Sequence, residues 1–191
     1  MTDYTILSNT AVGVGGLPSG ATVTALRDNP LAIAEGTAGA PQLRKVPLVI
    51  AQTVITGTPS SVDFFFDPDL YDDVSFSLSN VIPTNDNVFF SMQLSNDGTT
   101  FGGTSDILAS SVGNAAGEEG VSGYATMHGP SLLKKTVVTS GVFRFTATGG
   151  FGGVFSAFDN VTSAQTFGAQ FYFSAGTMAS GTITMYGVLK A

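Results

Sequence analysis

Two regular alternations of apolar and polar residues stand out between Asp72 and Phe101. In the first, three apolar residues occupy one face of a strand and three serines the other; the apolar ones are Val74, Phe76 and Leu78. The second repeats this pattern with Val88, Phe90, Met92 and Leu94. It runs into Asn96-Asp97-Gly98, where glycine supplies the positive φ of a tight turn. The two strands predict an antiparallel sheet with one buried and one solvated face.

The chain from Val46 onward is a series of short apolar segments separated by turn residues. We expect eight to eleven strands, at residues 46–56, 61–66, 74–79, 88–95, 107–111, 123–127, 132–138, 142–148, 153–158, 167–174 and 181–189. No helical pattern separates them, so the prediction is an all-β fold, an antiparallel β-sandwich that is jelly-roll-like. Prolines are expected at strand ends or turns, at Pro47, Pro59, Pro68, Pro83 and Pro130. Loss of the last, apolar strand should expose a sheet edge.

Residues 1–45 differ from the rest because small residues and glycines dominate them. One short helical turn is expected within Thr22–Arg27, and another where Asn29 caps a turn that Pro30 begins. So small a segment buries too little apolar area to be stable alone. We therefore predict an extended N-terminal docking arm, residues 1–45, followed by a β-sandwich domain, residues 46–191. A flexible tail is the alternative that the glycines allow.

Composition narrows the possible functions. Hydrophobic residues make up 43% and charged residues 11%, with 24 Gly and 15 Phe, which is too apolar for disorder and unlike a helical bundle. The net charge is −7, and basic residues are adjacent only in Arg44-Lys45 and Lys134-Lys135, which argues against a nucleic-acid partner. The absence of cysteine excludes disulfides and thiolate metal sites. The low charge is compatible with assembly into a larger structure.

The start of the chain lacks the basic and apolar regions of a secretory signal, so none is expected. No run approaches the roughly 18 apolar residues of a membrane helix. We expect a soluble protein without membrane insertion.

Candidate catalytic residues form no local constellation. His128, the one histidine, lies in a predicted turn without a neighbouring carboxylate and nucleophile, so a turn or interface role is expected. Glu118 and Glu119 are adjacent in a glycine loop and are expected to be solvated. We predict no enzyme activity, no catalytic residues and no cofactor. Calcium is left open for five clustered aspartates that otherwise cap turns: Asp63, Asp67, Asp69, Asp72 and Asp73.

Other motifs are weaker. The glycines at 13–16 lack the strand and the helix of a phosphate-binding loop, and the sequon at 160–162 has no meaning without a secretory route. The glycine-rich loops 113–120 and 148–153 are the expected places for partner contacts. Three aromatic residues on outward strand positions could stack on a sugar or fill an intersubunit surface, and their strand location favours the latter: Phe89, Tyr172 and Tyr186.

Two segments carry a resemblance to a family. Residues 25–41, ALRDNPLAIAEGTAGAP, and residues 181–188, GTITMYGV, resemble parts of small structural proteins encoded among the virion genes of tailed bacteriophages. In those proteins an N-terminal docking segment precedes a β-sandwich that ends in Gly-x-Ile-x-x-Tyr-Gly. The resemblance implies a virion component, a tail-fibre, tail-tip or head-fibre protein, as a homotrimer whose arm binds other virion proteins. The arm residues expected to dock are Leu26, Arg27, Pro30, Leu31 and Ile33.

Alternatives remain within and outside this family. The same design would serve a capsid decoration protein that clamps neighbouring capsomers and stabilises the phage head. The projecting sandwich could also contact a host surface glycan or protein. A free carbohydrate-binding module or a small β-sandwich hydrolase is a further alternative, which predicts glycan affinity of the isolated monomer and leaves the first 43 residues unexplained.

Overall fold

The computed structural model describes residues 22–25, 27–29, 46–102, 105–115, 117–132, 136–145, 151–159 and 164–190. The chain divides into two units, Met1–Val46 together with Ala191, and Pro47–Lys190.

In the first unit, residues 22–25 and 27–29 are helical, in the region where a helical turn was predicted. The Arg27 Nε donates to the Asp28 Oδ1 at 2.6 Å, a hydrogen bond that raises the pKa of Arg27 and lowers that of Asp28. Asn29, predicted as the cap of a second turn, is itself helical, and a cap residue has non-helical dihedrals. The predicted turn after Pro30 lies outside the described residues. No helix in the described part of the chain is long and apolar enough to cross a membrane.

The second unit is built of strands, and the fold prediction is confirmed. Its described residues form ten strands and one 3-10 turn: β1 (Leu48–Ile55), β2 (Ser61–Phe65), η1 (Pro68–Leu70), β3 (Tyr71–Pro83), β4 (Val88–Ser95), β5 (Ser105–Val112), β6 (Val121–His128), β7 (Val137–Phe145), β8 (Phe151–Asp159), β9 (Gly168–Phe173) and β10 (Met178–Leu189). The five prolines of this unit that were expected at strand ends or turns all lie there.

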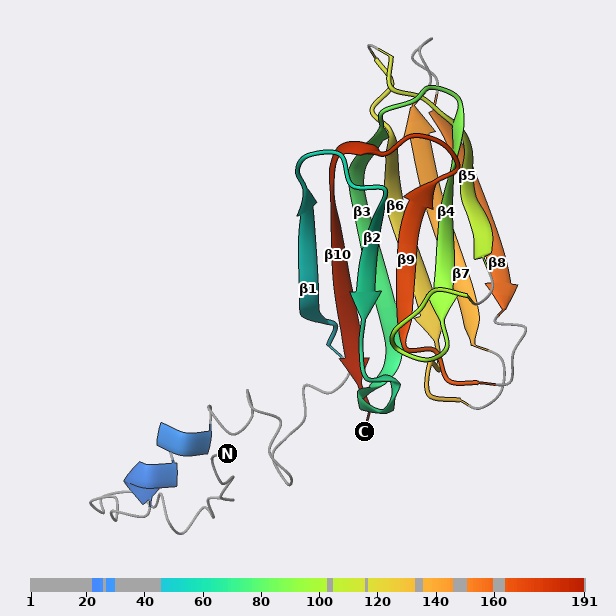
Figure 1. Cartoon of the computed structure of the whole chain (residues 1–191). Coiled ribbons are helices and arrows are strands. Elements are labelled where there is room, and N and C mark those ends of the chain that lie inside the picture. The colour runs from blue at the N-terminus through green and yellow to red at the C-terminus, as the bar shows by residue number, and fades with distance from the viewer. Residues whose placement is uncertain are drawn as a thin grey trace. The chain divides into compact units, whose positions relative to one another are not determined.

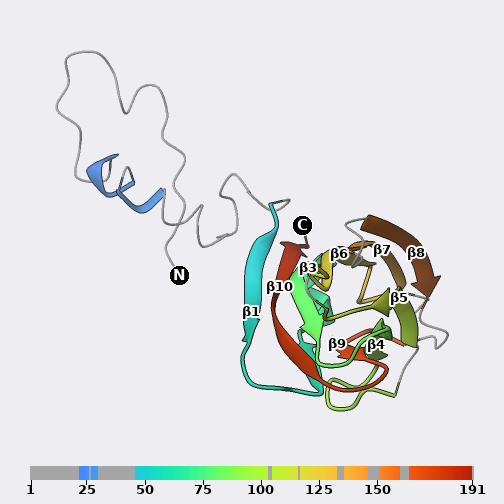
Figure 2. The same ribbon diagram turned by 90° about the horizontal axis from the view of Figure 1, so that it is seen from above.

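The strands form two antiparallel sheets that pack face to face (Figures 1 and 2). One sheet has the order β1-β10-β3-β6-β7-β8, and the other has the order β2-β9-β4-β5. The pairs β1·β10, β2·β9, β3·β6 and β4·β5 are those of a jelly roll, in which the first strand pairs with the last and the second with the one before it. The hairpin β7–β8 is an addition that widens the larger sheet next to β6.

The core lies between the two sheets and follows the predicted alternation. Val74, Phe76 and Leu78 of β3 are buried, and so are the four apolar residues predicted to share one face of β4. Ile183 and Met185 of β10 are also buried. Each such side chain contributes about 1.5–3 kcal/mol on burial, so the alternation of these strands supplies much of the driving force for folding.

The Asp97 turn after β4 is held by its own side chain. Gly98 has a φ of +72°, and the Asp97 carboxylate accepts hydrogen bonds from the Thr99 and Thr100 amides at 2.8 and 2.7 Å. It also accepts from the Thr100 hydroxyl at 2.6 Å. These bonds, that of the Thr100 hydroxyl first, hold the pKa of Asp97 well below its ordinary value. The sequence prediction of a tight turn here is confirmed.

Three details differ from the predictions. The strands β3 and β4 do not form one sheet; they lie in opposite sheets, because the link after Pro83 bonds to the β9–β10 connection through Thr84 N and Thr177 O at 2.8 Å. The strands predicted at 132–138 and 142–148 are one strand, β7. The last strand, β10, lies between β1 and β3, so its loss would also detach β1.

Candidate interaction surface

The outer face of the six-stranded sheet is a regular grid of side chains. Register pairs place one row across all six strands, consisting of Gln52, Thr184, Ser77, Tyr124, Gly141 and Phe155. A neighbouring row consists of Val49, Tyr186, Ser75, Thr126, Thr139 and Ala157. On the other side of the first row lie Val54, Thr182, Ser79, Ser122, Phe143 and Gly153. The face is therefore rich in hydroxyls.

Three aromatic rings gather at the β6–β7–β8 end of this grid, and we call Tyr124, Phe143 and Phe155 the aromatic cluster. Tyr124 is 49% exposed and Phe155 is 71% exposed, the largest exposure among the large hydrophobic residues described. The Phe143 and Phe155 rings meet edge to face, with centroids 5.8 Å apart and planes at 86°. Figure 2 shows β7 and β8 extending the larger sheet beyond β6. Phe143 and Phe155 belong to these two strands.

Glycines beneath the rings allow them to lie close to the sheet. A Cβ on Gly141 would lie 3.0 Å from atoms of both Tyr124 and Phe155, and a Cβ on Gly153 would lie 3.1 Å from Phe143. Gly141 is paired with Phe155, and Phe143 with Gly153. Aromatic rings that cover glycines on neighbouring strands hold the strand register and protect the exposed backbone. The cluster is therefore a rigid part of the sheet.

A short repeat in the sequence indicates this cluster, and the strand prediction did not include it. Gly-Val-Phe occurs at residues 141–143 and again at residues 153–155. In an antiparallel hairpin, each glycine of the repeat faces the phenylalanine of the other copy, and the valines point to the core side. The residues predicted instead, Phe89, Tyr172 and Tyr186, do not form one site.

Those three aromatic residues lie on two different sheets. Phe89 and Tyr172 belong to the four-stranded sheet, and Tyr186 belongs to the six-stranded one. The Tyr172 hydroxyl lies 2.7 Å from the Ser105 Oγ across the sheet surface. Only Tyr186 lies on the outer face that carries the aromatic cluster. It belongs to the neighbouring row, where it is paired with Ser75.

Charged groups lie at the end of the grid. Asp73 of β3 and His128 of β6 are paired, and the His128 Nδ1 lies 3.1 Å from the Asp73 Oδ1. The His128 Nε2 lies 3.1 Å from the Thr139 Oγ1. His128 is thus the last residue of β6 and not part of a turn, and the sheet supplies the carboxylate that the local sequence lacked.

The Asp73–His128–Thr139 arrangement matches the acid, base and hydroxyl order of a hydrolase triad. It lies on an open sheet face with half of the His128 side chain exposed to solvent. In the described part of the chain, β6 and β7 each pair with a strand on both sides, so their amides beside this group are not directed at a reacting oxygen as an oxyanion hole requires.

Four of the five aspartates considered for calcium have separate side-chain partners, and that of Asp73 is His128. The Asp67 Oδ1 caps η1 by accepting from the Asp69 amide at 2.9 Å, and Asp63 accepts from the Gln170 Nε2 at 2.9 Å. Asp69 accepts from the Gln165 Nε2 at 2.9 Å. Among the described residues, no three acidic or histidine side chains are grouped as a metal site requires.

The remaining predicted residues are dispersed. Glu118 is half-buried, and its Oε2 accepts from the Ala115 amide at 3.0 Å, so it closes its loop and is not simply solvated as expected. Only Glu119 of that pair is exposed. Of the five docking residues, Arg27 is described and exposed, whereas Leu26, Pro30, Leu31 and Ile33 lie outside the described residues. So do the glycines at 13–16 and the sequon.

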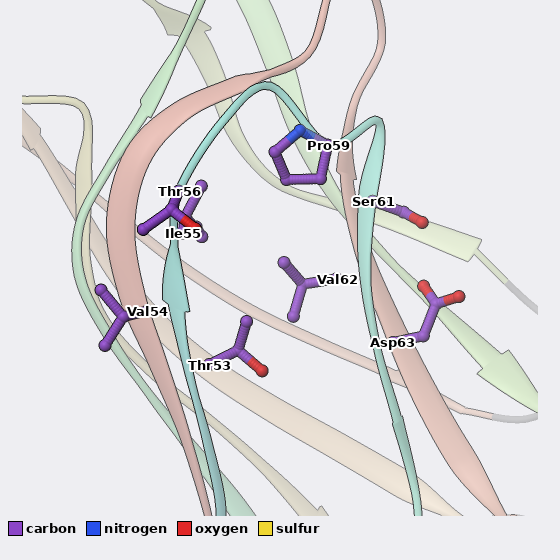
Figure 3. A pocket seen from close by; sticks show the side chains of 8 residues that line it. All are labelled: Thr53, Val54, Ile55, Thr56, Pro59, Ser61, Val62 and Asp63. Atoms are coloured by element: carbon purple, nitrogen blue, oxygen red, sulfur yellow. The ribbon is translucent and has the colours of Figure 1, made fainter.

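A groove of about 450 Å³ runs between the edge strands β1 and β2, and Figure 3 shows the side chains that line it. Ile55 and Val62 are buried and point between the two strands, whereas the single charged lining residue, Asp63, points to the other side of β2 (Figure 3). No titratable side chain among the residues lining the groove is directed into it.

Comparison with known proteins identifies no relative. No protein-family model, no curated protein and no solved structure matches the chain significantly.

Proposed function

We propose that this chain is a non-enzymatic structural protein of a tailed-bacteriophage virion, whose first unit attaches to the particle and whose jelly roll projects from it. The observation that carries the proposal is the division of the chain. Among the described residues, the hydrophobic core of the jelly roll runs from Ile55 to Met185, and these residues belong to the second unit. The jelly roll thus has its own core, and the first unit can serve attachment.

Two further observations support this function. The segment at residues 25–41 resembles docking segments of virion proteins, and the strand order is the jelly roll that many capsid proteins use. A trimeric tail-fibre or tail-tip protein is the form that we propose, with a head-fibre or capsid decoration protein as the alternative position.

Imaging of particles tests the proposal. Gold-labelled antibodies against this chain should bind purified particles of the phage that encodes it, at the tail for a fibre and at the head for a decoration protein. The double variant Leu31→Asp/Ile33→Asp should be lost from particles, whereas Phe155→Ser, a change in the jelly roll, should be incorporated normally. Particles without the chain, or normal incorporation of the arm variant, would refute attachment through the first unit.

A second candidate, a free carbohydrate-binding module, is favoured by the aromatic cluster alone. It predicts a monomer in light scattering that never associates with particles. The virion proposal predicts a homotrimer in the same measurement.

A further inference from the structure

We propose that the outer face formed by β6, β7 and β8 binds a neutral carbohydrate, with Tyr124 and Phe155 as the stacking platform. The proposal does not depend on attachment of the first unit to a particle, since all the residues involved belong to the jelly roll.

The geometry of the rings suits a sugar. The apolar C–H face of a pyranose carries slight positive charge and is attracted to the negative face of an aromatic ring. Tyr124 of β6 and Phe155 of β8 both pair with Gly141 of β7, the strand between them, and their rings lie close to it. The rings are therefore held in place before any ligand binds. A site on strands loses little entropy on binding, in contrast to a site on a loop.

The surroundings of the cluster favour a carbohydrate over a protein partner. The adjoining positions of the grid carry hydroxyls, on Ser77, Ser122, Thr126 and Thr139. The last three already bond to Asn80, Ser75 and His128, and each hydroxyl can both donate and accept. Serine is depleted in protein–protein interfaces, whereas hydroxyl groups both donate to and accept from the hydroxyls of a sugar. The flat rings can contact the apolar C–H face of a sugar, and the hydroxyls beside them can bond to its hydroxyl groups.

The charge distribution selects a neutral sugar. The three rows of the grid contain no charged residue. The row with Asp73, His128 and Asp159 lies four residues beyond Tyr124 and Phe155 along the strands, and two residues beyond Thr126 and Thr139. The four-residue spacing from the two rings is about 13 Å, which exceeds the Debye length of about 8 Å at physiological salt. Arg144 follows Phe143 in β7 but lies on the other face, where its Nη1 donates to the Ser111 carbonyl oxygen at 2.6 Å. The two rings therefore offer no partner charge to an anionic or a cationic sugar.

Affinity electrophoresis of the full-length protein tests the proposal. Gels would contain a neutral polysaccharide (dextran, laminarin or yeast mannan) or an anionic one (alginate). We expect retardation by at least one neutral polysaccharide, with affinity unchanged between about 0.05 and 0.5 M salt because no charges pair. Phe155→Ala and Tyr124→Ala should each weaken binding about five- to tenfold, as the loss of one aromatic contact would. Phe89→Ala, an exposed phenylalanine of the other sheet, should bind like the original chain.

Three outcomes would overturn the proposal. One is the absence of retardation by every neutral polysaccharide, and another is retardation by alginate alone. The third is light scattering in which the original chain is an oligomer that Phe155→Ala converts to monomers, because a second copy would then cover this face. Far-UV circular dichroism of each variant confirms that it is folded, and loss of particle attachment would bear only on the function of the first unit.

Discussion

Phe171 of β9 connects the aromatic side chains of the core. Its ring centroid lies 5.1 Å from that of Phe76 in the opposite sheet, and 6.0 Å from that of Phe90 on the next strand. The side chain is fully buried. This ring therefore links aromatic side chains of the two sheets within the core.

Phe171→Ala should lower the free energy of unfolding by about 3–5 kcal/mol, because it removes a buried ring and leaves a cavity between the sheets. Urea unfolding followed by circular dichroism measures the change. The matched control, Phe89→Ala, removes a 44% exposed ring and should change the stability by no more than about 0.5 kcal/mol. Equal losses in the two variants would contradict this assignment of the core.

The Asp97 carboxylate leads to a second prediction for a single residue, on how the stability of the fold depends on pH. The pKa of Asp97 is lower in the folded chain than in the unfolded one, so its ionised form stabilises the fold above the unfolded pKa of about 3.9. This contribution is lost as the pH falls below about 4 toward the folded pKa.

Asp97→Ala should therefore lower the Tm at pH 7, and the difference from the original chain should shrink as the pH is lowered from about 4 to 2. Thermal melts across that range provide the measurement. Asp106→Ala, in β5, is a control for the loss of one negative charge. A Tm difference that stays constant with pH would show that the turn bonds do not depend on the ionised carboxylate.

At the scale of elements, the β7–β8 hairpin is what distinguishes this jelly roll from an eight-stranded one. Ser140 and Ser156 face the core side, with their Oγ atoms 2.7 Å apart, and the aromatic cluster occupies the outer side. The two faces of the hairpin thus differ in a way that substitutions can test.

Val142→Asp should prevent folding, because it places an unpaired carboxylate at a fully buried position of β7. Phe155→Asp, the same kind of change on the outer face of β8, should leave a folded protein with a similar Tm. Circular dichroism and thermal melts distinguish the two. If Phe155→Asp unfolds the chain and Val142→Asp does not, then Phe155 faces the core and Val142 faces outward, contrary to the arrangement described.

At the scale of the whole molecule, the division into two units has a consequence for stability. The core residues described for the jelly roll all come from the second unit, so we expect it to fold without the first. The jelly roll should therefore be stable when the first unit is removed.

Deletion of residues 1–45 should leave a β-rich circular dichroism spectrum and change the Tm by no more than a few degrees, because no core side chain is removed. The same deletion should abolish incorporation into particles under the proposed function. A large drop in Tm would indicate that the first unit stabilises the jelly roll, and would weaken its assignment to attachment.

Local features of this chain could be predicted from the sequence for a physical reason. Strict alternation in β3, β4 and β10 shows which side chains are buried, since successive residues of a strand point to opposite faces whatever sheet they join. The turn at Asp97-Gly98 is equally local, because the carboxylate bonds to amides two and three residues away. The all-β class and these turns follow from short-range chemistry.

The pairing of strands was decided only by the tertiary structure. Adjacent strands β3 and β4 belong to opposite sheets, and β10 pairs with strands over a hundred residues before it. The candidate site depends on such pairs: Phe155 lies beside Gly141 and Tyr124, and His128 lies beside Asp73, only because of the registers of four strands. The sequence by itself determined which residues are apolar and alternate, whereas the sheet register decided which of them meet, because contacts between distant segments depend on the packing of the whole sandwich.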